Sequence, residues 1–73
     1  MNISEKIGSR LKNIRIELDI TQEKLSELSE LHTTYISDIE NGKRNISMKS
    51  LEKIIIGLNI TFVSFFDDKI FKL

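Results

Sequence analysis

The sequence predicts an all-α fold, a compact single domain of five short helices over residues 1–73. Apolar residues recur at spacings of three and four along nearly the whole chain, as they do on one face of a helix. Proline is absent and glycine occurs only three times, whereas strands joined by tight turns usually need more of both. A chain of 73 residues leaves room for one domain only.

The first helix is expected over residues 4–18. Its apolar stripe consists of Ile7, Leu11, Ile14 and Leu18, which share one helical face. Ser4 is the expected N-cap, because its hydroxyl can accept a hydrogen bond from a backbone N–H group that the first helical turn leaves free.

Four further helices begin with the same local pattern. In each, an apolar residue precedes the N-cap and another follows the cap four residues later, so that the two side chains can pack together. The caps are Thr21, His32, Ser47 and Thr61, and the helices are expected over residues 21–28, 32–41, 47–58 and 61–71. Gly42 can close the third helix in the left-handed conformation common after helix ends, and Leu58 with Asn59 can close the fourth.

The second and third helices have the spacing of a helix-turn-helix, in which the first helix braces the second across the major groove of DNA. Five apolar residues would attach the pair to the core: Leu25, Leu28, Leu31, Ile36 and Ile39. The exposed face of the third helix would carry short polar side chains suited to base edges, namely Thr33, Thr34, Ser37 and Asp38. A plain solvated face would show the same residues, so this pattern alone leaves both interpretations open.

The charge distribution and the composition bear on two kinds of function, DNA binding and metal binding. The formal net charge is zero, but residues 1–18 and 41–66 are basic while residues 19–40 are acidic. Segregated charge of this kind can present one positive face to DNA, although ordinary solvated helix faces would also produce it. Cysteine is absent and His32 is the single histidine, which excludes a thiolate or multi-histidine metal centre.

Several classes of protein are not expected. No apolar run approaches the roughly 20 residues needed to span a bilayer, and the first residues lack the apolar core of a signal peptide. No set of nucleophile, base and orienting residue occurs, and no glycine-rich phosphate loop. We therefore expect a cytoplasmic protein that is not an enzyme, with no cofactor, no metal, no membrane association and no small-molecule substrate.

Two strings carry a resemblance to a known family. The sequence TQEKL at residues 21–25 and the sequence TYISDIENGKRN at residues 34–45 strongly resemble the Xre/Cro–phage-repressor family, and within it the controller proteins of restriction–modification systems. The resemblance runs from about Ile7 to Phe66. It implies a lambda-repressor-like domain with its helix-turn-helix at about residues 21–41, and a dimeric transcriptional regulator bound to a double-stranded DNA operator. A phage or mobile-element repressor and the antitoxin of a toxin–antitoxin pair stay open as alternatives.

The resemblance also implies roles for single residues. Gln22 would contact a DNA phosphate, and Tyr35 would pack on the core with its hydroxyl reaching a phosphate. The loop after the third helix would clamp the DNA backbone through Lys43, Arg44 and Asn45. Arg15 and Glu40 would form an ion pair that joins the first and third helices.

Two residues depart from the family pattern. The turn between the second and third helices often has glycine where this chain has Glu30, so a different opening of the turn is possible if the backbone is left-handed there. Controller proteins also often carry arginine at the position of Thr33. Threonine cannot bind guanine in the bidentate manner of arginine, so the operator must differ in sequence or be read more by its shape.

The C-terminal region holds more apolar residues than one small core needs. Those expected to fill the core are Ile54, Ile55, Leu58, Ile60 and Phe66, and those left over in part are Ile56, Phe62, Val63, Phe65, Ile70 and Phe71. An exposed apolar patch usually marks an interface. We predict a homodimer whose seam is made by the fourth and fifth helices, about residues 47–71, through Ile56, Phe62, Val63 and Phe65. The alternative is a chain end that folds over its own core.

Overall fold

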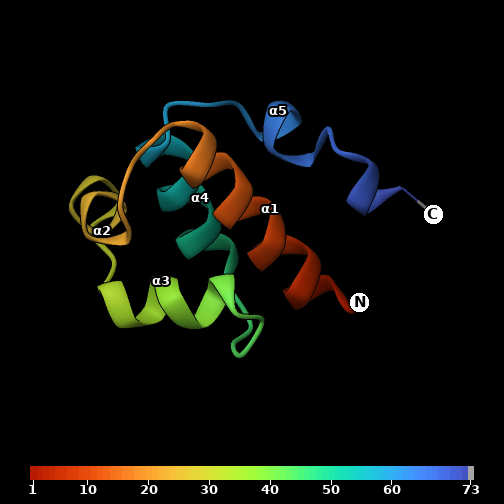
Figure 1. Ribbon diagram of the computed structural model, residues 1–73, viewed down its shortest axis with the longest axis horizontal. Coiled ribbons are helices and arrows are strands. Elements are labelled where there is room, and N and C mark those ends of the chain that lie inside the picture. The colour runs from red at the N-terminus through yellow and green to blue at the C-terminus, as the bar shows by residue number, and fades with distance from the viewer. Residues whose placement is uncertain (73) are drawn as a thin grey trace.

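The computed structural model describes residues 1–72 and consists of helices joined by short turns (Figure 1). The elements are α1 (Ile3–Glu17), α2 (Gln22–Ser29), α3 (Thr33–Glu40), α4 (Met48–Gly57), α5 (Phe62–Phe66) and the 3-10 helix η1 (Lys69–Phe71). Residues 1–72 contain no strand. The all-α fold expected from the sequence is therefore confirmed.

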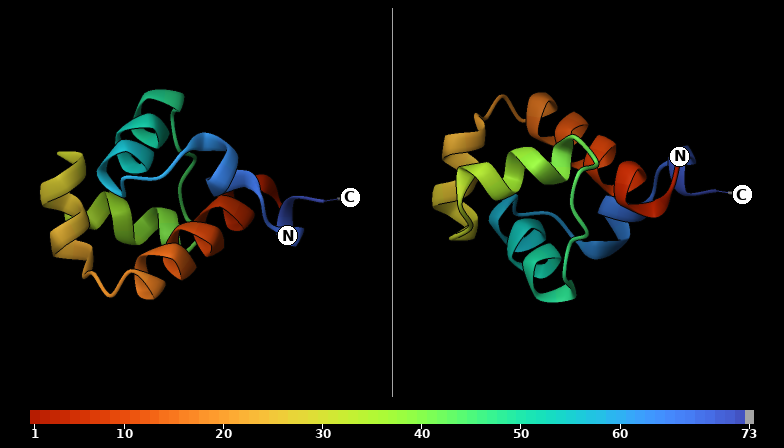
Figure 2. Two further views of the ribbon diagram at one scale, coloured as in Figure 1. Left: turned by 90° about the horizontal axis from the view of Figure 1, so that it is seen from above. Right: turned by 90° about the horizontal axis from the view of Figure 1, so that it is seen from below.

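The helices pack around α1 and α3. α3 lies against both α1 and α2, while α2 also packs on α4, and η1 returns to α1. Figure 2 shows α2 at one end of the molecule and both chain termini at the other. The first helix of the helix-turn-helix pair therefore lies far from the C-terminal segment.

The helix starts follow local capping signals, with one exception. Thr21, Ser47 and Thr61 each cap a helix by accepting from a backbone N–H three residues later, and His32 occupies the cap position of α3 without a side-chain hydrogen bond. The prediction of Ser4 as the first cap was wrong. α1 is capped by Asn2, which accepts from the Glu5 N–H at 2.9 Å while the Glu5 carboxylate accepts from the Asn2 N–H at 2.9 Å, so that one pair satisfies two free donors.

The fifth helix is shorter than predicted. A continuous helix over residues 61–71 was wrong, because α5 ends at Phe66 and Asp68 has an extended backbone before η1 begins. The Asp68 carboxylate accepts from the Ile70 N–H at 2.9 Å. Aspartate favours such local bonds over a helix interior, and this bond starts a new turn instead of continuing the old one.

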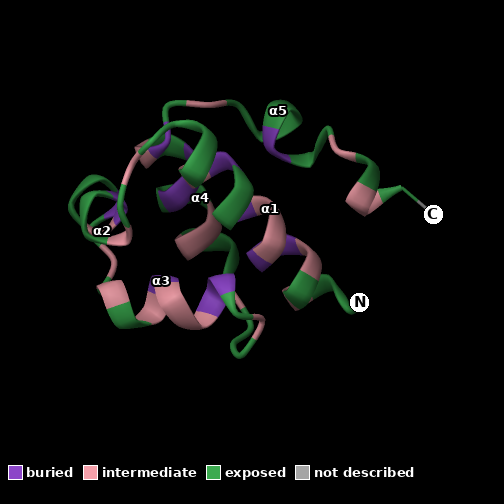
Figure 3. Ribbon diagram, in the orientation of Figure 1, coloured by how far each residue is buried: buried purple, intermediate pink, exposed green. Residues whose placement is uncertain are grey.

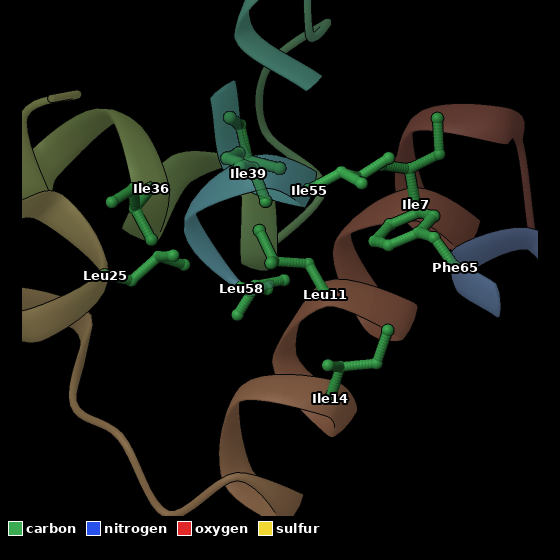
Figure 4. Packing of buried hydrophobic residues seen from close by; sticks show 10 residues of the cluster. Ile7, Leu11, Ile14, Leu25, Ile36, Ile39, Ile55, Leu58 and Phe65 are labelled. Carbon is green, nitrogen blue, oxygen red and sulfur yellow. The ribbon is translucent and has the colours of Figure 1, made fainter. Parts of the chain in front are cut away.

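The core draws residues from all five α-helices and from the end of α4 (Figure 4). Its buried members are Ile7, Leu11, Ile14, Leu25, Ile36, Ile39, Ile54, Ile55, Leu58 and Phe65. Three predicted core residues are instead exposed. Leu18 lies beyond the end of α1, Leu28 lies where the backbone of α2 meets Gly57 of α4, and Phe66 is described below. Figure 3 shows how burial is restricted to the inward faces of the helices.

The burial of Phe65 and Phe66 is the reverse of what the sequence predicts. Phe65 is fully buried, whereas Phe66 is 37% exposed. The prediction of Phe65 as a seam residue was therefore wrong, and so was the prediction of Phe66 as a core residue. The physical reason is the cap at Thr61, which directs the fourth helical residue, Phe65, inward toward the apolar residue before the cap.

The turn between α2 and α3 is tight despite its non-glycine residue. Glu30 adopts the left-handed conformation, with φ 60° and ψ 29°, so the turn is not opened differently as the departure from glycine had suggested. A left-handed backbone is strained for a residue with a Cβ atom. Glu30 adopts this strained conformation at the C-cap of α2.

This strain leads to the first prediction. Replacing Glu30 by glycine should raise the free energy of unfolding by about 1 kcal/mol, because glycine adopts the left-handed conformation without the clash of a Cβ atom. Urea unfolding followed by circular dichroism would measure it. The control is Glu52→Gly in the interior of α4, which should lower stability by about 1 kcal/mol. A neutral or destabilising Glu30→Gly change would show that Glu30 makes compensating contacts.

Candidate nucleic-acid interface

The motif predicted at residues 21–41 is present as α2, a short turn and α3. One hydroxyl group of α2 holds the turn, because Ser26 donates to the Leu31 carbonyl. The buried Ser29 hydroxyl donates to the Leu25 carbonyl at 2.7 Å, within α2 itself. The Ser26 bond thus ties the end of the turn to the helix that braces α3.

α3 has one buried and one open side. Ile36 and Ile39 are buried, and Thr34 is exposed. The remaining polar side chains of the open side are partly exposed: Thr33, Ser37 and Asp38. Within residues 1–72, none of these four polar side chains makes a hydrogen bond or an ion pair. Their donors and acceptors therefore remain available to a ligand that lies along α3.

The loop after α3 places the predicted clamp residues beside this face. The left-handed Gly42, with φ 69°, ends the helix, and the Lys43 N–H donates to the Asp38 carbonyl at 2.9 Å. Lys43, Arg44 and Asn45 are all exposed. Two positive charges and an amide thus flank the C-terminal end of α3.

Tyr35 and Arg44 lie in contact. The Arg44 guanidinium carbon lies 4.8 Å from the centroid of the Tyr35 ring, within the range of a cation–π interaction. Tyr35 is partly buried against the core. The structure thus has Tyr35 pack on the core, and its ring helps to hold Arg44 near α3.

Asn45 is oriented by the first helix. The Ser4 hydroxyl donates to the Asn45 carbonyl oxygen Oδ1 at 2.7 Å. Because the oxygen is engaged, the amide nitrogen with its two N–H donors is the free end of the side chain. Donors are what a phosphate requires. The sequence analysis assigned Ser4 to the cap and therefore missed this contact.

The predicted ion pair between Arg15 and Glu40 is confirmed. Arg15 donates from Nε to Glu40 Oε2 at 2.7 Å and from Nη2 to Oε1 at 3.1 Å, while its Nη1 donates to the Ile20 carbonyl at 2.8 Å. The side chains are only 13% and 2% exposed. Hydrogen bonding to Glu40 raises the pKa of Arg15, against the lowering effect of its burial, so the guanidinium stays charged at every ordinary pH.

Gln22 belongs to the same network. Its Nε2 donates to Glu40 Oε1 at 3.0 Å, so the first residue of α2 is held against the last residue of α3. A side-chain amide has two N–H donors, and one remains for a phosphate. Sequence reasoning assigned Gln22 only to DNA and did not anticipate this internal partner.

Three of the four predicted seam residues lie on the surface. Ile56 is 67% exposed, Phe62 47% and Val63 80%, whereas Phe65 belongs to the core as described above. Phe66 adds a partly exposed ring to α5. We call these residues, Ile56, Phe62, Val63 and Phe66, the C-terminal apolar face.

Residues 1–72 show no feature of a membrane-spanning, metal-binding or pocket site. No helix there is long and apolar enough to cross a bilayer. No group of three or more His, Cys, Asp or Glu side chains is placed to hold a metal ion, and no pocket is formed. The open side of α3 with its flanking residues is therefore the candidate site of this part of the chain.

Comparison with known proteins agrees with this geometry. A family model described as helix-turn-helix matches residues 11–65. The chain is 46% identical over 68 residues to control protein C.MunI of a Mycoplasma species, covering 92% of each chain. It is 43% identical over 60 residues to control protein C.BamHI of Bacillus amyloliquefaciens, covering 81% of this chain and 74% of the relative.

Solved structures extend the comparison to the fold. The crystal structure of the wild-type restriction–modification controller protein C.Esp1396I superposes with a TM-score of 0.87 at 43% identity, covering 92% of this chain and 86% of the other. The same controller protein is known as a tetramer in complex with its natural 35 base-pair operator, where the TM-score is again 0.87. The chain therefore belongs to the helix-turn-helix family and, within it, to the controller proteins of restriction–modification systems.

Proposed function

We propose that the protein is a transcriptional regulator that binds a double-stranded DNA operator as a homodimer and controls the genes of a restriction–modification system. The observation that carries the proposal is the open side of α3, where four polar side chains have no partner within residues 1–72, while α2 and the following loop flank it. The operator complex of C.Esp1396I supports DNA as the ligand. Because a regulator acts where its operator lies, we place the protein in the cytoplasm.

The residues divide into two roles. Thr33, Thr34, Ser37 and Asp38 read base edges in the major groove, because they project from the helix that enters it. Asp38 can accept only, which suits the amino group of cytosine. Thr33 lacks the bidentate donors of an arginine, so this operator is read differently from one that depends on an arginine–guanine contact.

The second role is to hold the DNA backbone. Gln22 has one free N–H and lies at the N-terminus of α2, where helix geometry favours phosphate. Lys43 and Arg44 supply charge, and the amide of Asn45 supplies donors. These contacts carry no sequence information but set the position of α3 over the bases.

The homodimer is supported by the C-terminal apolar face, whose four large apolar side chains are exposed on neighbouring helices, since an exposed apolar patch usually marks an interface. Assembly of C.Esp1396I as a tetramer on its operator supports self-association. A twofold dimer would place two copies of α3 about 34 Å apart, one turn of DNA. A methyltransferase gene and an endonuclease gene beside this one would separate the proposal from the phage-repressor and antitoxin alternatives.

A binding titration tests the two roles. We expect Arg44→Ala to weaken binding to an operator, a mutated operator and unrelated DNA by similar factors, and to make the salt dependence shallower by about one unit. Thr34→Ala should instead change the preference among the three DNAs, by about 1–3 kcal/mol. Affinities at several salt concentrations provide both readouts.

The control for this titration is Lys69→Ala, which removes an exposed cation on η1, away from α3 (Figure 1). It should leave affinity and salt dependence nearly unchanged. The roles are reversed if Thr34→Ala weakens all three DNAs equally while Arg44→Ala alters only the preference. If neither change affects binding, α3 does not contact the DNA and the proposed function is wrong.

A further inference from the structure

Arg10 of α1 reaches the end of α5 with its whole guanidinium group. Its Nε donates to the Phe65 carbonyl at 2.7 Å and its Nη2 to the Ser64 carbonyl at 2.8 Å. Its Nη1 lies 3.2 Å from the Asp68 carboxylate oxygen Oδ2. The Arg10 side chain is only 14% exposed. One side chain thus binds three acceptors that follow it by more than fifty residues in the chain.

These bonds complete a helix that is too short to be stable alone. α5 has five residues, and a helix of any length leaves its last four carbonyls without helical partners. At the other end, the Thr61 hydroxyl already accepts from the Ser64 N–H at 3.0 Å. Arg10 acts as the matching cap at the C-terminal end, where a positive charge also opposes the negative end of the helix dipole.

The inner side of α5 is anchored at the same place. Phe65 is fully buried, and its ring centroid lies 5.0 Å from that of Phe66 and 6.3 Å from that of Phe71. Phe65 attaches α5 to the core through one side chain. The two carbonyl bonds and the ion pair of Arg10 add a second attachment, made to the backbone at the end of α5.

The outer side of α5 carries most of the C-terminal apolar face. Phe62, Val63 and Phe66 come from α5, and Ile56 from α4. We propose that Arg10 is the positioning residue of the dimer seam: its forked contact sets the orientation in which α5 presents these side chains to a second copy of the chain. This inference rests on the homodimer proposed above.

The fork is the feature that distinguishes arginine here. A lysine at position 10 would keep the positive charge and could still pair with Asp68, but its ammonium group lacks the planar set of donors that binds three acceptors at once. An Asp68→Asn change removes the charge of the ion pair and leaves both carbonyl bonds in place. The two variants therefore distinguish the effect of the ion pair with Asp68 from the effect of the forked hydrogen bonds to the two carbonyls.

Sedimentation equilibrium of the full chain provides the test. For Arg10→Lys we expect the dimer dissociation constant to rise by about tenfold, the equivalent of one charge-assisted hydrogen bond. Asp68→Asn should change it by less than about threefold, as for a partly exposed pair. Val63→Asp, which places a charge on the seam without touching Arg10, should abolish the dimer. All measurements are made at a temperature where circular dichroism shows each variant folded.

The outcomes distinguish the inference from the proposed function. A role confined to stability would lower the free energy of unfolding of Arg10→Lys while its dissociation constant stayed that of the wild type, and this would overturn the inference alone. An equal loss in Asp68→Asn would also overturn it, because charge and not the fork would then hold α5. A wild-type chain that stays monomeric at all concentrations would overturn the homodimer and the inference together, while operator binding is measured separately in the titration above.

Discussion

Replacing Gly8 by alanine is expected to lower the free energy of unfolding by about 3 kcal/mol or more, a large part of the stability of a small domain. Gly8 is buried where α1 crosses α3. A Cβ atom there would lie 2.0 Å from the Ile39 carbonyl oxygen and 3.1 Å from its carbon. Both are backbone atoms, so no side-chain rotation relieves the clash, and the two helices would have to move apart.

The matched control for this change is Gly57→Ala in α4. The nearest atoms to its added Cβ would be the Leu28 carbonyl carbon and oxygen, both at 3.2 Å. That contact needs a shift of only a few tenths of an ångström, and alanine has a higher helix propensity than glycine, so Gly57→Ala should cost much less stability than Gly8→Ala. Thermal and urea unfolding at one fixed protein concentration would compare the variants, because dimerisation makes stability concentration-dependent. Wild-type stability in Gly8→Ala would refute the close crossing.

Replacing Arg15 by alanine is expected to cost about 3 kcal/mol of stability. The Glu40 side chain is only 2% exposed, and the change would leave its charge buried with Gln22 as the one remaining side-chain partner. The Ile20 carbonyl would also lose its donor. Removing one member of a buried pair is costly mainly because the other charge stays behind.

A double variant provides the diagnostic comparison. Arg15→Met with Glu40→Met removes both charges and should recover most of the stability lost in Arg15→Ala, since an apolar pair of similar size can replace a buried ion pair. Lys24→Ala breaks the exposed contact with Glu27, 3.6 Å long, and should cost no more than a few tenths of a kcal/mol. A double variant no more stable than Arg15→Ala would show that the loss comes from packing and not from the unpaired carboxylate.

Local signals in the sequence were sufficient for most of the fold. The caps at Thr21, Ser47 and Thr61 act on N–H groups three residues away, so a short stretch of sequence contains both partners. The same holds for the left-handed Gly42 at the end of α3. The ion pair of Arg15 with Glu40 was predicted for a different reason, because the family resemblance supplied a contact that local pattern does not contain.

Where two neighbouring residues could serve the same local role, only the tertiary structure shows which of them does so. Asn2 and Ser4 are both good caps by residue type, and the choice of Asn2 accompanies a bond from Ser4 to Asn45, far along the chain. For Phe65 and Phe66 the local signal was present, because the cap at Thr61 places Phe65 at the fourth helical position. The packed structure shows that this signal, and not the equal apolar character of the two residues, decides which of them is buried.

The sequence by itself determined five helical segments, a helix-turn-helix and the residues that α3 presents, because these follow from side-chain type and spacing within a few turns. The attachment of α5 to α1 through Arg10 was decided by the tertiary structure alone. Its acceptors are mostly backbone carbonyls more than fifty residues away, and every residue type has a carbonyl. No pattern of side chains marks such a partner, so it is found only when the chain has folded.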